Sequence, residues 1–127
     1  MAGILGAAAL SIAVLCLLVQ CEIVRSQGQG TVYTVGDKKG WDLDFKIMNW
    51  PNNKHFKEGD VLVFKSKNQY GVAKVDAKEF QQCQTNNETK RYYSGNDKFT
   101  LQKGSNYFIS TVPDYCGYGM RIKVDVL

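Results

Sequence analysis

The sequence has a single histidine, His55, among its 127 residues. Histidine is the side chain that most often acts as a general base near neutral pH, so its scarcity excludes most sites in which a base activates a nucleophile. Asp42 and Asp44 are the nearest candidates for a catalytic acid pair, but no partner base or glycine-rich loop stands beside them. Aspartates in such a place are typical of turns. We therefore expect a protein that is not an enzyme.

Long apolar runs are also scarce. The sequence has one, which extends from Ile4 to Val19. It is short for a membrane span and has the composition of a secretory signal, although no Lys or Arg precedes it. The alternative is an uncleaved N-terminal anchor. We predict a signal peptide over residues 1–26, cleaved between 21 and 30, and a secreted domain over residues 31–127 with no membrane anchor.

Cysteine is limited to four residues, of which Cys16 and Cys21 lie in or beside the predicted leader. The exported chain then keeps Cys83 and Cys116, which are 33 positions apart. In an oxidising compartment these two most simply form one disulfide. A pair of metal-binding or reactive thiols is the alternative, but no histidine or second cysteine pair lies near either residue.

The net charge of +4 makes the chain moderately basic. Net charge bears on the choice of partner more than on the fold. There is no basic stripe or recognised nucleic-acid motif, so nucleic acid is excluded as a partner. The triplet Asn87-Glu88-Thr89 matches the N-glycosylation acceptor pattern, which predicts a glycan on Asn87 in an exported chain.

Short β-type segments separated by turns containing Gly and Asp make up most of the remaining sequence. The clearest is the last, in which Ile122, Val124 and Val126 alternate with polar residues and share one face with Met120. Residues 77–83 form either one helical turn or a bent segment. With no long amphipathic helix, the pattern predicts an all-β sandwich with Greek-key connections. The strands expected are residues 31–35, 61–64, 72–75, 98–102, 106–111 and 120–126.

The stretch from Phe108 to Met120 resembles the C-terminal ligand loop of the phytocyanins, the plant blue-copper family, and most closely the basic plantacyanin branch. Further landmarks of the resemblance are Gly40-Trp41, the Phe56–Asp60 turn and the Tyr92–Gly95 turn. It extends from about residue 31 to residue 127. It implies a cupredoxin fold, a buried Trp41 and the same bridge between Cys83 and Cys116.

In phytocyanins the loop carries a Cys, a His and a Met as copper ligands, and a fourth ligand is the His of an upstream His-Asn-Val segment. The resemblance places these positions at Ser110, Tyr115, Met120 and, in Tyr70-Gly71-Val72, at Tyr70. A blue-copper centre needs two imidazoles and a thiolate with a weak axial thioether. A neutral serine hydroxyl does not replace a thiolate. We therefore predict no blue-copper site and no bound cofactor.

The substituted positions allow several interpretations. Tyr70 and Tyr115 either fill the former metal pocket or form, with Tyr118, an aromatic contact face. Capture of a hard ion such as iron(III) by phenolates is opposed by a phenol pKa near 10. We expect a monomeric binding or signalling module in the apoplast, whose partner is acidic pectin or an extracellular protein. The alternative is copper-dependent electron transfer of the basic blue protein type.

Overall fold

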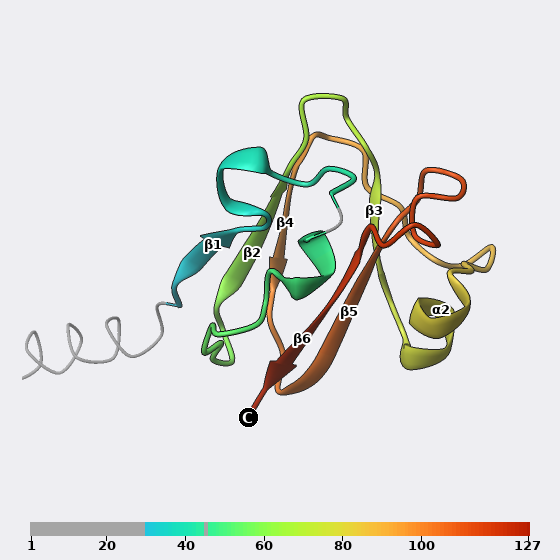
Figure 1. Ribbon diagram of the computed structural model, residues 1–127. Helices are drawn as coiled ribbons and strands as arrows, with labels where there is room; N and C mark the ends of the chain where they lie inside the picture. Colours follow the sequence, from blue (N-terminus) through green and yellow to red (C-terminus); the bar gives the residue numbers. More distant parts are fainter. Residues whose placement is uncertain (1–29, 45) are drawn as a thin grey trace, which may run out of the picture.

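The computed structural model describes residues 30–44 and 46–127, so the predicted signal peptide lies outside the described residues. Six strands form two three-stranded sheets that face each other (Figure 1). The first sheet has the order β1-β2-β4 and the second the order β3-β5-β6. The all-β sandwich predicted from the sequence is confirmed. The strands are β1 (Val32–Thr34), β2 (Val61–Lys65), β3 (Val72–Val75), β4 (Asn96–Thr100), β5 (Gly104–Ser110) and β6 (Arg121–Val126).

Strand β1 pairs with β2 in parallel, whereas all the other pairs are antiparallel. A parallel pair needs a crossover connection, and the segment between β1 and β2 provides it. This segment contains the 3₁₀ helices η1 (Asp37–Lys39) and η2 (Ile47–Asn49). The chain then passes to the second sheet for β3, returns for β4 and crosses again to β5.

An aromatic cluster centred on Phe64 fills the space between the sheets. Its ring lies 4.9 Å from Trp41, 5.5 Å from Phe99 and 5.0 Å from Phe108, measured between centroids. Trp41 is buried, as predicted. Its indole N–H donates a hydrogen bond of 3.2 Å to the carbonyl oxygen of Gly71, which ties the core to the segment before β3.

A short helix, α2 (Ala77–Gln82), settles the ambiguity over residues 77–83. It begins with a capping box in which the Asp76 side chain accepts from the Glu79 N–H and the Glu79 side chain accepts from the Asp76 N–H. The predicted disulfide between Cys83 and Cys116 is confirmed, with a Cα–Cα distance of 5.7 Å. It joins the end of α2 to the loop between β5 and β6. Together with Ala73, Ile109 and Phe80, the bridge forms a second, smaller core.

The bounds of all strands except β3 differ from the prediction by one or two residues, and the end of β4 is the clearest case. Strand β4 ends at Thr100, so Leu101 lies just beyond it. Leu101 is nevertheless buried, because its backbone is bound to the turn before β2 through the Asp60 carbonyl and the Gly59 N–H. Within the part of the chain that the structure describes, no helix is long and apolar enough to cross a membrane.

Candidate functional site

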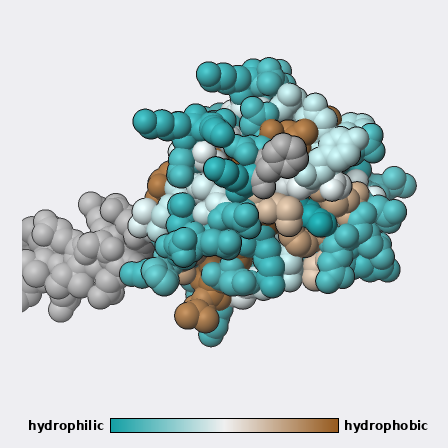
Figure 2. All heavy atoms as spheres, viewed as in Figure 1, coloured by the Kyte–Doolittle hydropathy of each residue, from teal (hydrophilic) through white to brown (hydrophobic). Residues whose placement is uncertain are grey.

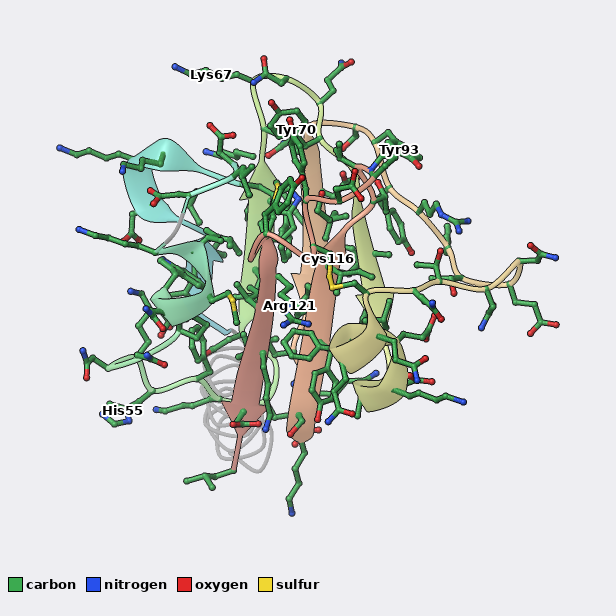
Figure 3. The ribbon with its side chains drawn as sticks, turned by 45° about the vertical axis from the view of Figure 1, so that its right-hand side comes forward. His55, Lys67, Tyr70, Tyr93, Cys116 and Arg121 are labelled. Carbon is green, nitrogen blue, oxygen red and sulfur yellow. A yellow bond between two sulfur atoms is a disulfide. The ribbon has the colours of Figure 1, made fainter. Side chains whose placement is uncertain are left out.

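The four positions singled out from the sequence lie together at one end of the sandwich. The Ser110 N–H donates to the Met120 carbonyl at 2.9 Å, and the Met120 N–H donates to the Tyr115 carbonyl at 2.9 Å. The rings of Tyr115 and Tyr70 meet at an angle of 80° with 5.5 Å between their centroids. Strand ends and the loop between β5 and β6 therefore bring all four residues into one cluster. Tyr70 lies at the opposite end of the molecule from the exposed His55 (Figure 3).

Ser110 and Met120 form the inner half of this cluster. Both are buried, and Met120 belongs to the main hydrophobic core. The Ser110 hydroxyl accepts a hydrogen bond of 3.2 Å from the Val112 N–H, which is the pattern of a side chain supporting a turn. The inner half of the site thus supplies one neutral hydroxyl that is already engaged and one thioether.

Tyr70 and Tyr115 form the outer half and pack against the core while remaining partly exposed. The Asn68 amide donates to the Tyr70 hydroxyl at 3.3 Å. Hydrogen bonding with Tyr70 is the first cause that raises the pKa of Tyr115 above its ordinary value of 10.0, followed by the charge of Tyr70 and by burial. Tyr115 is therefore a neutral phenol at physiological pH, held in place by a second phenol.

Gly71 shows that the neighbourhood of the cluster is also closely filled. A Cβ atom at this position would lie 2.0 Å from the Thr111 Oγ1 atom and 2.5 Å from the Tyr93 Cε1 atom. The Thr111 Oγ1 atom is buried and has no hydrogen-bond partner among the described residues. This role of Tyr93 was not predicted from the sequence. The signal was the glycine itself, since the family pattern has an asparagine there.

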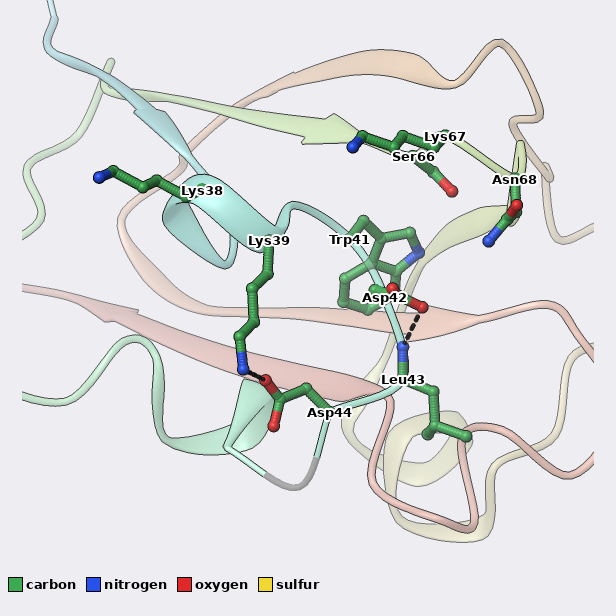
Figure 4. A pocket seen from close by; sticks show the side chains of 9 residues that line it. All are labelled: Lys38, Lys39, Trp41, Asp42, Leu43, Asp44, Ser66, Lys67 and Asn68. Carbon is green, nitrogen blue, oxygen red and sulfur yellow. Dashed lines mark hydrogen bonds and ion pairs between the residues drawn. The ribbon is translucent and has the colours of Figure 1, made fainter.

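An open hollow of about 570 Å³ lies beside this end of the molecule (Figure 4). Across its wall the Lys39 ammonium forms a 2.7 Å ion pair with Asp44. This contact raises the pKa of Lys39 and lowers the pKa of Asp44, because the hydrogen bond and the opposite charge stabilise the ionised form of each side chain. The hollow is lined by Lys38, Lys39, Trp41, Asp42, Leu43, Asp44, Ser66, Lys67 and Asn68.

Two further tyrosines are largely exposed, Tyr118 at 64% and Tyr93 at 56%. Tyr118 follows Tyr115 in the loop between β5 and β6, and Tyr93 lies against Gly71. The surrounding surface is mostly hydrophilic, with small separate hydrophobic patches (Figure 2). We call Tyr70, Tyr93, Tyr115 and Tyr118 the tyrosine end. Of the predicted contact residues, Tyr118 is thus free to meet a partner, whereas Tyr70 and Tyr115 present only part of their rings.

The predicted glycosylation site lies in a different region. Asn87 is exposed in a turn between α2 and β4. The Thr89 hydroxyl donates a 2.7 Å hydrogen bond to the Glu79 carboxylate, which connects this turn to the helix. The position is accessible from solvent, and modification of Asn87 stays a prediction.

Comparison with known proteins places this chain in a family. The model of the plastocyanin-like domain matches residues 41–120. Among curated proteins, the chain is 42% identical to a basic blue protein of Arabidopsis thaliana over 88% of this chain and 83% of the relative, and 39% identical to a chemocyanin of Lilium longiflorum over 91% and 87%. Among solved structures, it is similar to cucumber basic protein, a blue copper protein, with a TM-score of 0.71 and 38% identity over 76% of this chain and all of that one. The chain therefore belongs to the phytocyanin family of plastocyanin-like proteins.

Proposed function

We propose that this phytocyanin does not form a blue-copper centre and acts outside the cell as a binding or signalling module through its tyrosine end. The observation that carries the proposal is the donor set at the four converging positions. It consists of a serine hydroxyl, two tyrosine phenols and one thioether. Copper that cycles between two oxidation states needs imidazole nitrogen and thiolate sulfur, and these side chains supply neither.

The packing supports the same conclusion. The Ser110 hydroxyl is engaged with the Val112 N–H, and the Tyr70 and Tyr115 rings contact each other where the family has two imidazoles. The space beside Gly71 is occupied by Thr111 and Tyr93. The residues present therefore do not fit a blue copper ion, and we derive no reaction through one. They also provide no base for catalysis.

The exposed tyrosines support a role in binding. Tyrosine combines a large apolar ring with a hydroxyl and loses little conformational entropy on binding, which suits it to contact surfaces. The exposed rings of Tyr118 and Tyr93 provide such a surface. The net charge of +4 favours an acidic partner, for which pectin in the plant cell wall is our first candidate and an extracellular protein the second.

The metal part of the proposal is tested by copper loading. Purified protein is incubated with copper(II), dialysed and analysed for absorption and metal content, with cucumber basic protein as the positive control. We expect no intense blue absorption and no stoichiometric copper in this protein. One tightly held copper per molecule would favour electron transfer instead.

A gain-of-function variant tests whether the four positions have been identified correctly. The combined substitutions Tyr70→His, Ser110→Cys and Tyr115→His, with Met120 retained, restore the family donor set. We expect this variant to develop blue absorption with copper(II), while the matched variant Tyr70→Phe, Ser110→Ala, Tyr115→Phe does not. A folded restored variant that stays colourless would show that these are not the ligand positions.

The binding part is tested separately on immobilised polygalacturonate. Electrostatic attraction weakens as salt screens the charges, so retention should fall steeply with ionic strength. Tyr118→Ala should weaken retention. The control is Leu127→Ala, because Leu127 is also exposed but follows the C-terminal end of β6, away from the tyrosine end. Equal retention of both variants would exclude the tyrosine end as the contact face.

A further inference from the structure

The close approach of Tyr70 and Tyr115 has a chemical consequence that does not depend on metal or partner. All seven tyrosines of the chain lie within the described residues. Among their ring contacts, one pair consists of two tyrosines, and it is Tyr70 with Tyr115. Among the described aromatic residues, three other tyrosines contact a ring, and each meets a phenylalanine: Tyr33, Tyr92 and Tyr107.

The two rings meet edge to face. Their ring centroids are 5.5 Å apart and their planes are inclined at 80°. At this separation a small rotation of the two side chains brings the ring carbons next to the hydroxyls within reach of each other. Those ortho carbons are the positions at which two phenoxyl radicals couple.

Both rings are also held in place and reachable. The backbone of Tyr70 is bound through its N–H to the Ser66 hydroxyl at 3.0 Å, and the Tyr115 carbonyl is bound to Met120. Both side chains are partly exposed, so an oxidant can take electrons from them at the surface. A held pair reacts within the molecule faster than with a second molecule, because its partner is already positioned.

We propose that Tyr70 and Tyr115 form an oxidative cross-linking site, at which a haem peroxidase and hydrogen peroxide couple the two phenols into an intramolecular dityrosine. Each phenol loses one electron and one proton to give a phenoxyl radical. A carbon–carbon bond forms between the ortho carbons, and the ring hydrogens move to the oxygens to restore both phenols. The two electrons and two protons reduce one hydrogen peroxide to two water molecules.

The bond would connect two parts of the chain that are separate in sequence. Tyr70 lies in the segment between β2 and β3, and Tyr115 lies in the loop between β5 and β6. The disulfide from Cys83 to Cys116 already holds that loop to α2. A second bond from the neighbouring residue would fasten the tyrosine end to both sheets.

The experiment treats the purified protein, with its disulfide intact, with a haem peroxidase and hydrogen peroxide. We expect the monomer to develop dityrosine fluorescence and to lose two hydrogen atoms in mass. After reduction and proteolysis, fragmentation should identify a link between Tyr70 and Tyr115. Tyr70→Phe and Tyr115→Phe should each abolish the monomer signal, because phenylalanine keeps the ring but cannot form a phenoxyl radical.

The exposed Tyr118 is the matched control. Tyr118→Phe should keep the monomer cross-link, because the linked pair does not include Tyr118. Persistence of the link in Tyr70→Phe, coupling only into dimers, or no product under conditions that couple free tyrosine would each overturn the proposal. Peptide mapping of the unsubstituted protein decides the matter even if a variant fails to fold. None of these outcomes depends on copper or on a wall partner, so the proposed function is tested independently.

Discussion

Gly71 illustrates how closely the residues beside Tyr70 are packed. The residue that follows Tyr70 has no side chain, and the space it leaves is taken by the Thr111 hydroxyl and the Tyr93 ring. Tyr93 in turn becomes one of the two most exposed tyrosines. This part of the tyrosine end is thus a close-packed arrangement of several side chains.

A substitution at Gly71 tests this packing. Gly71→Ala places a Cβ atom 2.0 Å from Thr111 Oγ1, so both neighbouring side chains must move. Overpacking of this kind typically lowers stability by about 1–3 kcal/mol. The control is Gly117→Ala, whose Cβ would lie 3.4 Å from the Asp114 carbonyl oxygen. It should change stability by less than about 0.5 kcal/mol in urea unfolding. Equal effects of the two substitutions would contradict the packing described here.

The raised pKa of Tyr115 should make the stability of the folded protein depend on pH in the alkaline range. Hydrogen bonding with Tyr70 raises the pKa of Tyr115 above 10.0 in the folded protein. Above pH 10 the unfolded chain therefore loses this proton first, and stability that is fully present below pH 10 declines until the folded pKa is passed. Tyr115→Phe should remove this part of the alkaline decline in thermal unfolding measured from pH 8 to pH 11. Parallel curves for the two proteins would show that the phenol pair is not coupled.

Among the secondary structure elements, helix α2 is stabilised by a contact with Arg121 of strand β6. The Arg121 guanidinium, at the start of β6, donates to the Phe80 carbonyl at 2.8 Å and lies 5.1 Å from the Phe80 ring centroid. The last carbonyls of a helix have no partner within the helix, so an external donor satisfies one of them. A six-residue helix has too few internal hydrogen bonds to be stable by itself.

Removal of this donor should loosen α2. Arg121→Met keeps an unbranched side chain but leaves the Phe80 carbonyl without its charged partner. Hydrogen bonds to charged groups contribute about 1.5–3 kcal/mol, and the partial exposure of Arg121 favours the lower end. Lys123→Met, two residues along the same strand and exposed, should have an effect below about 0.5 kcal/mol. Hydrogen exchange of α2 amides should rise only in the Arg121 variant.

The elements differ in how well the sequence predicts them. The alternation in β6 was read correctly because each second side chain is buried between the sheets. The order of the strands within the sheets was not predicted, because the parallel pairing of β1 with β2 depends on contacts between distant segments. The convergence of Tyr70, Ser110, Tyr115 and Met120 followed from the family resemblance. The contact of Tyr93 with Gly71 did not, since only the folded chain brings residues 71 and 93 together.

In the molecule as a whole, the tyrosine end is held in place by the packing of the two sheets and by one disulfide. The sheets meet through the aromatic cluster around Phe64. The disulfide holds the loop that carries Tyr115 and Tyr118 to the end of α2. Both are needed because that loop contains no regular strand or helix between Ser110 and Arg121.

Removal of the disulfide should therefore destabilise the fold. Cys83 and Cys116 are 33 residues apart, and in the chain-entropy model a bridge of this span stabilises the fold by about 3.5–4 kcal/mol by restricting the unfolded chain. The double variant Cys83→Ala, Cys116→Ala should lose a similar amount in urea unfolding. Because the main core does not contain the bridge, the near-ultraviolet circular dichroism of Trp41 and Phe64 should persist. Loss of that signal under native conditions would show that the bridge holds the folded sandwich together directly, and that its effect is not confined to the unfolded chain.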